Sequence, residues 1–121
     1  MNNKITGQRG EELIKELLKN ESFIILEQNY KKFFGEIDII AQKANLIVFV
    51  EVKTRKNAHV SLFELVGPTK QRKIIQVAQE YICKKLFTEC TYRFDVALIE
   101  MSNNAEPDIQ YIPNAFNKRE L

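Results

Sequence analysis

The sequence has no tryptophan, a single histidine and only two cysteines. One histidine, His59, cannot build a histidine-rich metal site, and it argues against a hydrolase of the Ser-His-Asp type. Cys83 and Cys90 lack the Cys-x-x-Cys spacing of a zinc site and are too few for a disulfide framework. We therefore expect two reduced thiols, as is usual inside the cell. Nucleophilic catalysis of the Ser-His-Asp kind is therefore not expected.

Long hydrophobic runs are missing as well. The longest, LIVFV at residues 46–50, is far shorter than the roughly 20 residues that span a bilayer. The first six residues form no apolar signal region. We therefore expect a cytoplasmic protein with no membrane partner. The 121 residues, 45% of them hydrophobic, suit one domain over residues 1–121 with a single buried core.

The apolar periodicity predicts an α/β protein. Helical spacing covers residues 8–19 and 69–86, and strand patterns cover residues 23–26, 36–41, 46–54, 92–100 and 109–112. The predicted order is α-β-β-β-α-β-β, with a mixed five-stranded sheet. The second helix should connect the strands before and after it as a crossover, so those two strands should be parallel.

Charged side chains interrupt two strands that should be buried. Glu51 and Lys53 follow directly on the apolar run 46–50, and Asp38 lies among isoleucines. Charges are rarely buried unless they are paired or bind a metal ion. Because side chains alternate along a strand, Glu51 and Lys53 share one face. The pattern therefore predicts a charged cluster on an otherwise apolar sheet.

A hairpin between these two strands would bring the charges together. With Ala41 placed opposite Leu46, an antiparallel register puts Asp38 opposite Phe49. Asp38 and Glu51 are then diagonal neighbours on one face, roughly 7–8 Å apart at the backbone. The two carboxylates would be able to reach one shared cation.

Two carboxylates beside a lysine suit a hard divalent cation. Mg²⁺ binds to one or two carboxylates, to waters and to substrate phosphate oxygens, and it activates water for attack on a phosphodiester. Lys53 could then orient the water or neutralise charge on the phosphate. The alternative is a structural ion pair of Lys53 with Asp38 or Glu51, and the residues alone leave both interpretations open.

Positive charge is concentrated in the middle of the chain. Residues 53–73 hold six lysine and arginine residues against one glutamate, whereas residues 100–121 hold four acidic residues against two basic ones. Such a stripe is typical of a phosphate-binding surface, although a solvated basic loop has the same composition. The candidate nucleic-acid-binding residues are Arg55, Lys70, Arg72 and Lys73.

Asp38 followed by Glu51-Val52-Lys53 resembles the Asp…Glu-x-Lys signature of the restriction-endonuclease-like nuclease superfamily. A wider set of segments is similar to the bacterial YraN-like family, which is assigned to that superfamily. The segments occur in order over nearly the whole chain: GQRGE at 7–11, Asn29, GEIDIIA at 35–41, VFVEVKTR at 48–55, KQRKI at 70–74, RFDV at 93–96 and NAF at 114–116. The sequence departs from this family at residues 58–61, where relatives have a Phe-Gly-like turn.

The resemblance implies a three-layer α/β/α restriction-endonuclease-like core around the mixed sheet. It implies that Asp38, Glu51 and the carbonyl of Val52 bind Mg²⁺ or Mn²⁺, and that Lys53 assists catalysis. Glu11 matches an acidic position that reaches the same site in several branches of the superfamily. Its alternative is a first-turn acid favoured by the helix dipole.

Three further charged residues have competing interpretations. Lys70 opens the second helix, where a helix start and a cation can both meet phosphate, or it is a surface lysine. Arg93 and Asp95 share a strand face, and we interpret them as a structural ion pair with each other.

The leading hypothesis is a Mg²⁺-dependent endonuclease that hydrolyses DNA phosphodiester bonds. From a chain this short we expect no separate recognition domain, which favours selection of DNA structure over DNA sequence. A homodimer would supply two sites for a two-strand cut. The alternatives are a non-catalytic nucleic-acid-binding protein that retains the nuclease fold, and a protein-interaction scaffold. Salt-sensitive binding without cleavage would identify the first of these alternatives.

Overall fold

The computed structural model describes residues 3–55, 66–85, 89–101 and 106–117. Seven helices and strands follow in chain order over these residues: α1 (Asn3–Asn20), β1 (Ile24–Lys32), β2 (Gly35–Lys43), β3 (Leu46–Arg55), α3 (Pro68–Lys85), β4 (Thr91–Glu100) and β5 (Asp108–Phe116). The predicted order α-β-β-β-α-β-β is confirmed. The departure at residues 58–61, which includes His59, lies outside the described residues.

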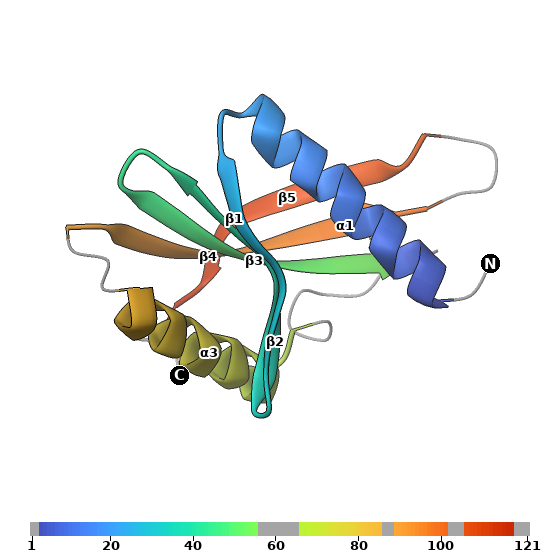
Figure 1. Cartoon of the computed structure of the whole chain (residues 1–121). Coiled ribbons are helices and arrows are strands. Elements are labelled where there is room, and N and C mark those ends of the chain that lie inside the picture. The colour runs from blue at the N-terminus through green and yellow to red at the C-terminus, as the bar shows by residue number, and fades with distance from the viewer. Residues whose placement is uncertain (1–2, 56–65, 86–88, 102–105, 118–121) are drawn as a thin grey trace.

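The five strands form one mixed sheet in the order β1-β2-β3-β4-β5. β3 and β4 are parallel, and the other neighbouring strands are antiparallel. The chain passes between the two parallel strands through α3, which confirms the predicted crossover. Figure 1 shows α1 against one face of the sheet and α3 against the other, so the fold has the three α/β/α layers expected for a restriction-endonuclease-like core.

The central strand explains why the chain carries its run of apolar residues at 46–50. Phe49 is buried with α3 residues in one core layer, and Val48 and Val50 are buried with α1 residues in the other. A strand covered by helices on both faces buries every side chain, so it shows no alternation of apolar and polar residues.

Among the described residues, no helix is long and apolar enough to cross a membrane.

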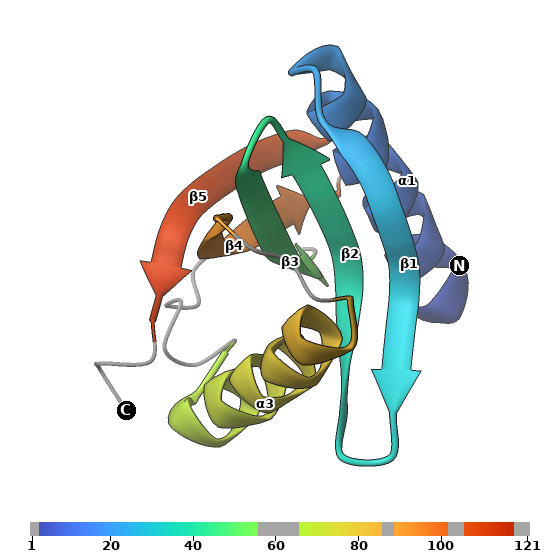
Figure 2. The ribbon, with the colours of Figure 1, turned by 60° about the vertical axis from the view of Figure 1, so that its left-hand side comes forward.

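The first two strands are much longer than their apolar patterns predict. β1 runs on through the polar residues 27–32, and β2 begins at Gly35. They form a hairpin in which Lys32 pairs with Gly35 across a two-residue turn. Figure 2 shows this hairpin extending beside α3, beyond the rest of the sheet. The projecting part buries few side chains, and for that reason it has no strong hydrophobic period.

The register between β2 and β3 differs from the predicted one. Lys43 pairs with Leu46, and Ala41 pairs with Val48 instead of Leu46. The turn is only two residues long, with Ala44 at a positive φ of 53°, so β2 continues two residues further than its apolar run. A shift by two residues keeps every side chain on its predicted face, whereas a shift by one would have reversed the faces.

Candidate active site

The carboxylate of Asp38 lies where β2 and β3 separate. Backbone pairing of these strands ends at Ile39 and Val50. Beyond that point the backbone N–H of Val52 donates a hydrogen bond of 2.8 Å to Oδ2 of Asp38. A side chain therefore replaces the backbone partner, and the strands diverge without leaving this N–H unpaired. The divergence opens the sheet at the two acidic residues.

Glu51 is the acidic partner that β3 contributes. Its side chain is 6% exposed and forms ion pairs with Lys70 at 3.1 Å and with Lys53 at 3.7 Å. Lys70 comes from the first turn of α3 and Lys53 from the same face of β3. Asp38 and Glu51 line the same pocket, and the negative charge of Glu51 contributes to the raised pKa of Asp38. The predicted meeting of the two acids is therefore present in the structure.

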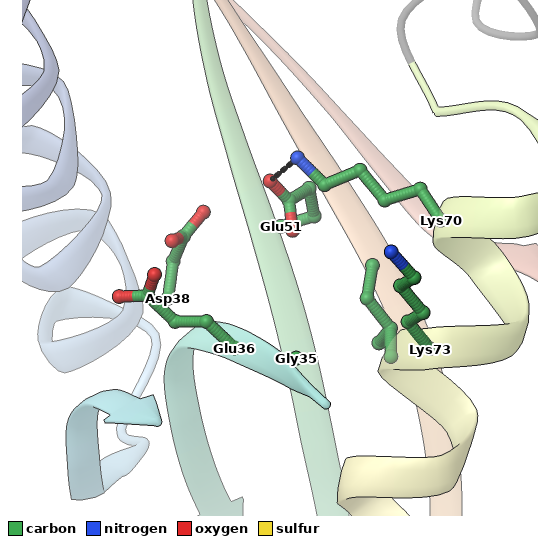
Figure 3. Close-up of a pocket in the computed structure, with 7 residues that line it drawn as sticks. Gly35, Glu36, Asp38, Glu51, Lys70 and Lys73 are labelled. Atoms are coloured by element: carbon green, nitrogen blue, oxygen red, sulfur yellow. Dashed lines mark ion pairs between the residues drawn. The ribbon is translucent and has the colours of Figure 1, made fainter. Parts of the chain in front are cut away.

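Asp38, Glu51 and Lys70 line a pocket of ≈ 120 Å³ between the β2–β3 opening and α3. Figure 3 shows Lys70 reaching from α3 to Glu51, with Asp38 and Glu36 on the β2 side of the pocket. The lining residues are Gly35, Glu36, Asp38, Glu51, Lys70, Lys73 and Ile74. Acidic groups thus occupy the strand side of the pocket, and the two lysines of α3 occupy the helix side.

Burial gives Asp38 an unusual affinity for protons. Removal of its carboxyl group from water, together with the negative charge of Glu51, raises the pKa of Asp38 to about 8 from an ordinary 3.8. The hydrogen bond from Val52 works in the opposite direction but is outweighed. In the absence of a cation the two acids are therefore too close to be ionised together at little cost.

The lysines around Glu51 also influence each other. Partial burial lowers the pKa of Lys53, and the neighbouring ammonium of Lys70 lowers it further. The Glu51 carboxylate opposes this shift. Lys53 thus stands beside the acidic pair as an amine that gives up its proton more readily than a surface lysine does.

Glu11 approaches the site from α1. Burial raises the pKa of Glu11, and the negative charges of Glu36 and Glu51 add to the rise, while a hydrogen bond from the side chain of Asn29 opposes it. Asn29 lies on β1 with a positive φ of 53°. Glu11 is therefore held by β1 and lies within the electrostatic influence of the two pocket acids, but it does not line the pocket.

The candidate basic residues fall into two groups. Lys70 and Lys73 line the pocket. Arg55 and Arg72 are exposed outside it: Arg55 donates to the carbonyl of Thr54 at 3.2 Å, and Arg72 donates to Thr69 Oγ1 at 3.4 Å. Only the first pair is placed to meet a group bound beside Asp38 and Glu51.

The donor set can be compared with what a divalent cation needs. Asp38 and Glu51 offer hard carboxylate oxygens, which suit Mg²⁺, and this ion completes its coordination with water and substrate oxygens. Within the described residues, no cluster of three or more acidic, histidine or cysteine side chains could hold a metal ion alone. The two acids therefore fit a partly hydrated ion and do not form an all-protein cage.

The interpretation of Arg93 and Asp95 as a structural pair agrees with their contacts. The fully buried carboxylate of Asp95 accepts two hydrogen bonds from the guanidinium of Arg93, at 2.8 and 2.9 Å. The hydroxyl of Tyr111 and the backbone N–H of Asn114 donate to the same carboxylate, at 2.5 and 2.9 Å. These contacts join β4 to β5 where their register shifts, and they lie outside the pocket.

Three residues that line the pocket were not candidate site residues in the sequence analysis. They are Gly35, Glu36 and Ile74. Glu36 lies two positions before Asp38 on the same strand, so strand alternation was a signal for it. No sequence signal points to the contact between Lys70 and Glu51, because it depends on how α3 packs on the sheet.

Comparisons with known proteins identify the family of this chain. The model of the uncharacterised protein family UPF0102 matches residues 10–99. A UPF0102 protein of Dictyoglomus turgidum is 44% identical over 118 residues, which cover 96% of this chain and all of the relative. A UPF0102 protein of Clostridium botulinum is 43% identical over 117 residues, which cover 94% of this chain and 95% of the relative.

A solved structure shares the fold. It is that of Archaeoglobus fulgidus Hjc, a Holliday junction resolvase from an archaeal hyperthermophile. The match has a TM-score of 0.54 and 16% sequence identity, and it covers 87% of this chain and 73% of the other. At this level of identity the similarity establishes a nuclease-like α/β fold.

Proposed function

We propose that this chain, which belongs to the uncharacterised protein family UPF0102, is a Mg²⁺-dependent endonuclease that cuts DNA according to its structure. The observation that carries the proposal is the convergence of Asp38 and Glu51 in a pocket whose opposite wall holds two lysines. An acidic wall suits a divalent cation, and a basic wall suits the phosphate that the cation would activate.

The predicted site residues in and beside the pocket would each have a role in such a reaction. Asp38 and Glu51, with the backbone carbonyl of Val52, would hold the ion. When bound, Mg²⁺ or Mn²⁺ would favour ionisation of water and neutralise charge on the phosphate. Lys53 would orient the attacking water. Lys70 would leave Glu51 to bind a phosphate oxygen as the substrate enters.

The reaction is hydrolysis of a phosphodiester. A bond forms between the water oxygen and phosphorus, the bond from phosphorus to one deoxyribose oxygen breaks, and the proton from water ends on that leaving oxygen. Lys70 and Lys73, on the wall opposite the acids, would stabilise the negative charge that grows on the phosphate oxygens. Glu11 would not contact the ion and would influence it only through its negative charge.

The choice of DNA structure over sequence is supported by the fold neighbour, which is described as a Holliday junction resolvase. A two-strand cut would also need two copies of the chain, so we expect a homodimer on the substrate. We expect this reaction in the cytoplasm.

The test is cleavage of labelled linear, flapped and four-way DNA with Mg²⁺ or Mn²⁺. Wild type should cut at least one substrate, and Asp38→Asn and Glu51→Gln should each lose at least about 100-fold in rate. Glu12→Gln is the matched control, because Glu12 is an exposed acid on α1 that pairs with Lys15. Cleavage that persists unchanged in either pocket variant would refute this active site.

A second candidate function is DNA binding without catalysis. It is favoured by one observation: Glu51 is already neutralised by Lys70 and Lys53. This alternative predicts binding that weakens steeply with salt, that is reduced in Lys73→Gln, and that leads to no cleavage with either cation.

A further inference from the structure

The turn between β1 and β2 carries a phenylalanine that the fold does not bury. The side chain of Phe33 is fully exposed, at 101% of its reference area. Its neighbour Phe34 packs against the core layer under α3. The two rings meet edge to face, with centroids 5.0 Å apart. Phe34 therefore anchors the turn, and Phe33 projects from it.

Turn geometry does not account for Phe33. Two-residue hairpin turns favour glycine or asparagine, because their usual forms need a positive φ. Neither Phe33 nor Phe34 has a positive φ, so many polar residues would fit this position equally well. Apart from its contact with Phe34, the ring of Phe33 is left in water, and no core packing accounts for it.

The tip is fixed beside the proposed active site. Gly35 and Glu36, which follow the turn directly, line the pocket. Gly35 lies so close to α3 that an added Cβ would stand 3.1 Å from a methyl group of Val77 and 3.3 Å from the carbonyl of Lys73. The hairpin therefore rests on α3, beside which it extends in Figure 2. Phe33 stands two residues before Gly35, the first residue of the hairpin that lines the pocket.

The two elements that meet here also carry lysines. Lys31 is exposed two residues before Phe33 on the hairpin, and Lys73, an exposed lysine of α3, has its backbone against Gly35. Lys32 is held by an ion pair with Glu80 at 3.4 Å, so it contributes less free charge. An aromatic face next to ammonium groups is the combination that binds single-stranded DNA, since the ring stacks on a base while the lysines bind the backbone.

We propose that Phe33 stacks on an unpaired base of the DNA whose phosphate occupies the pocket, so that the substrate is a flap or branch and not a fully paired duplex. This inference rests on the proposed function. In an intact duplex the base faces are already stacked on each other, and Phe33 could reach one only by unstacking a step. At a flap or branch point a base face is available without that cost.

The test uses the full chain, and binding is measured in a chelator so that no cleavage occurs. The probe is a synthetic flap DNA with the fluorescent base 2-aminopurine at the first unpaired position, and a fully paired duplex of the same sequence is the comparison. Wild type should quench the flap fluorescence and bind the flap more tightly than the duplex. Phe33→Ala should lose the quenching and about tenfold in flap affinity, with duplex affinity unchanged. Phe33→Trp should retain both.

The matched control is Ile24→Ala. Ile24 is another exposed apolar side chain of β1, at 69%, but it lies at the opposite end of the strand. Equal flap affinity and quenching in wild type and Phe33→Ala would overturn the inference, as would an equal loss in Ile24→Ala or an absence of DNA binding by wild type. If wild type quenches the flap fluorescence but does not cleave after Mg²⁺ is added, the proposed nuclease activity is contradicted and the role of Phe33 is retained. If wild type cleaves but Phe33→Ala changes neither quenching nor affinity, the role of Phe33 is contradicted and the nuclease activity is retained.

Discussion

The backbone N–H of Val52 donates its hydrogen bond to Asp38, a side chain, where a backbone carbonyl of β2 would otherwise accept it. This contact ends the pairing of β2 with β3 and orients one carboxylate oxygen at the same time. The opening of the sheet and the placement of the acid therefore have a single cause. A change at Asp38 should affect stability as well as chemistry.

The pH dependence of stability should reveal the buried acid. In the metal-free protein Asp38 keeps its proton up to a pKa of about 8, whereas in the unfolded chain it loses it near 3.8. Folding takes up a proton between these values, so this group's contribution to stability falls as pH rises from about 4 to about 8. Asp38→Asn keeps an acceptor for Val52 and removes the titration.

We expect Asp38→Asn to exceed wild type in unfolding free energy by about 1 kcal/mol or more at pH 8, and by less at pH 5. Urea denaturation in a chelator at both pH values measures the difference. Curves that stay the same distance apart at the two pH values would show that Asp38 does not titrate in this range.

The carboxylate of Asp95 should matter for stability and not for chemistry. Asp95→Ala leaves Arg93 and Tyr111 without their buried partner, and loss of one member of a buried ion pair costs about 3–5 kcal/mol. Asp108→Ala, at an exposed position of β5, should cost less than about 0.5 kcal/mol. Thermal unfolding compares the two variants. A Tm for Asp95→Ala close to that of wild type would contradict the structural role.

Gly10 should resist substitution because α1 passes very close to β3 there. An added Cβ would collide with Oγ1 of Thr54, which is buried and has no hydrogen-bond partner among the described residues. Gly10→Ala should destabilise the protein by about 1–3 kcal/mol, and Thr54→Ala in the same chain should restore part of the loss. Gly7→Ala is the control: it has open space and should stabilise α1 by about 0.5–1 kcal/mol. Equal effects of the two alanines, measured by urea denaturation, would refute the close contact.

Lysine contacts with phosphate should appear in the salt dependence of DNA binding. Lys73→Gln should reduce the slope of log affinity against log salt by about one. Lys19→Gln, which removes a lysine paired with Glu16 at the end of α1, should leave the slope unchanged. Fluorescence anisotropy over a range of salt concentrations measures both. A slope that responds only to the Lys19 change would place the DNA on the other face of the sheet.

The sequence predicted the architecture because the apolar patterns are strong where the core is. The run 46–50 is buried on both faces, and α3 shows a clear helical period, so both elements were recognisable. The length of the β1–β2 hairpin was underestimated. Its projecting part buries few side chains, so its sequence has no strong apolar pattern. Arg93 and Asp95 were correctly paired because they lie two positions apart on one strand.

Long-range contacts were the part that the sequence could not supply. The predicted register of β2 and β3 was wrong by two residues, because apolar runs locate strand ends only approximately. Because the error is an even number of residues, every side chain stays on its predicted face of the sheet, and Asp38 and Glu51 still line the same pocket. The ion pair of Lys70 with Glu51 joins α3 to β3, and only the packing of the helix on the sheet determines it.

The parallel pairing of β3 with β4 has a consequence for synthesis of the chain. β4 completes the central strand from Leu46 to Arg55, yet it leaves the ribosome only after α3. Until then the nascent chain presents the unprotected edge of its most apolar strand, and such edges recruit strands from other molecules. Chaperone protection during translation is therefore most valuable to this protein just before residue 91 emerges.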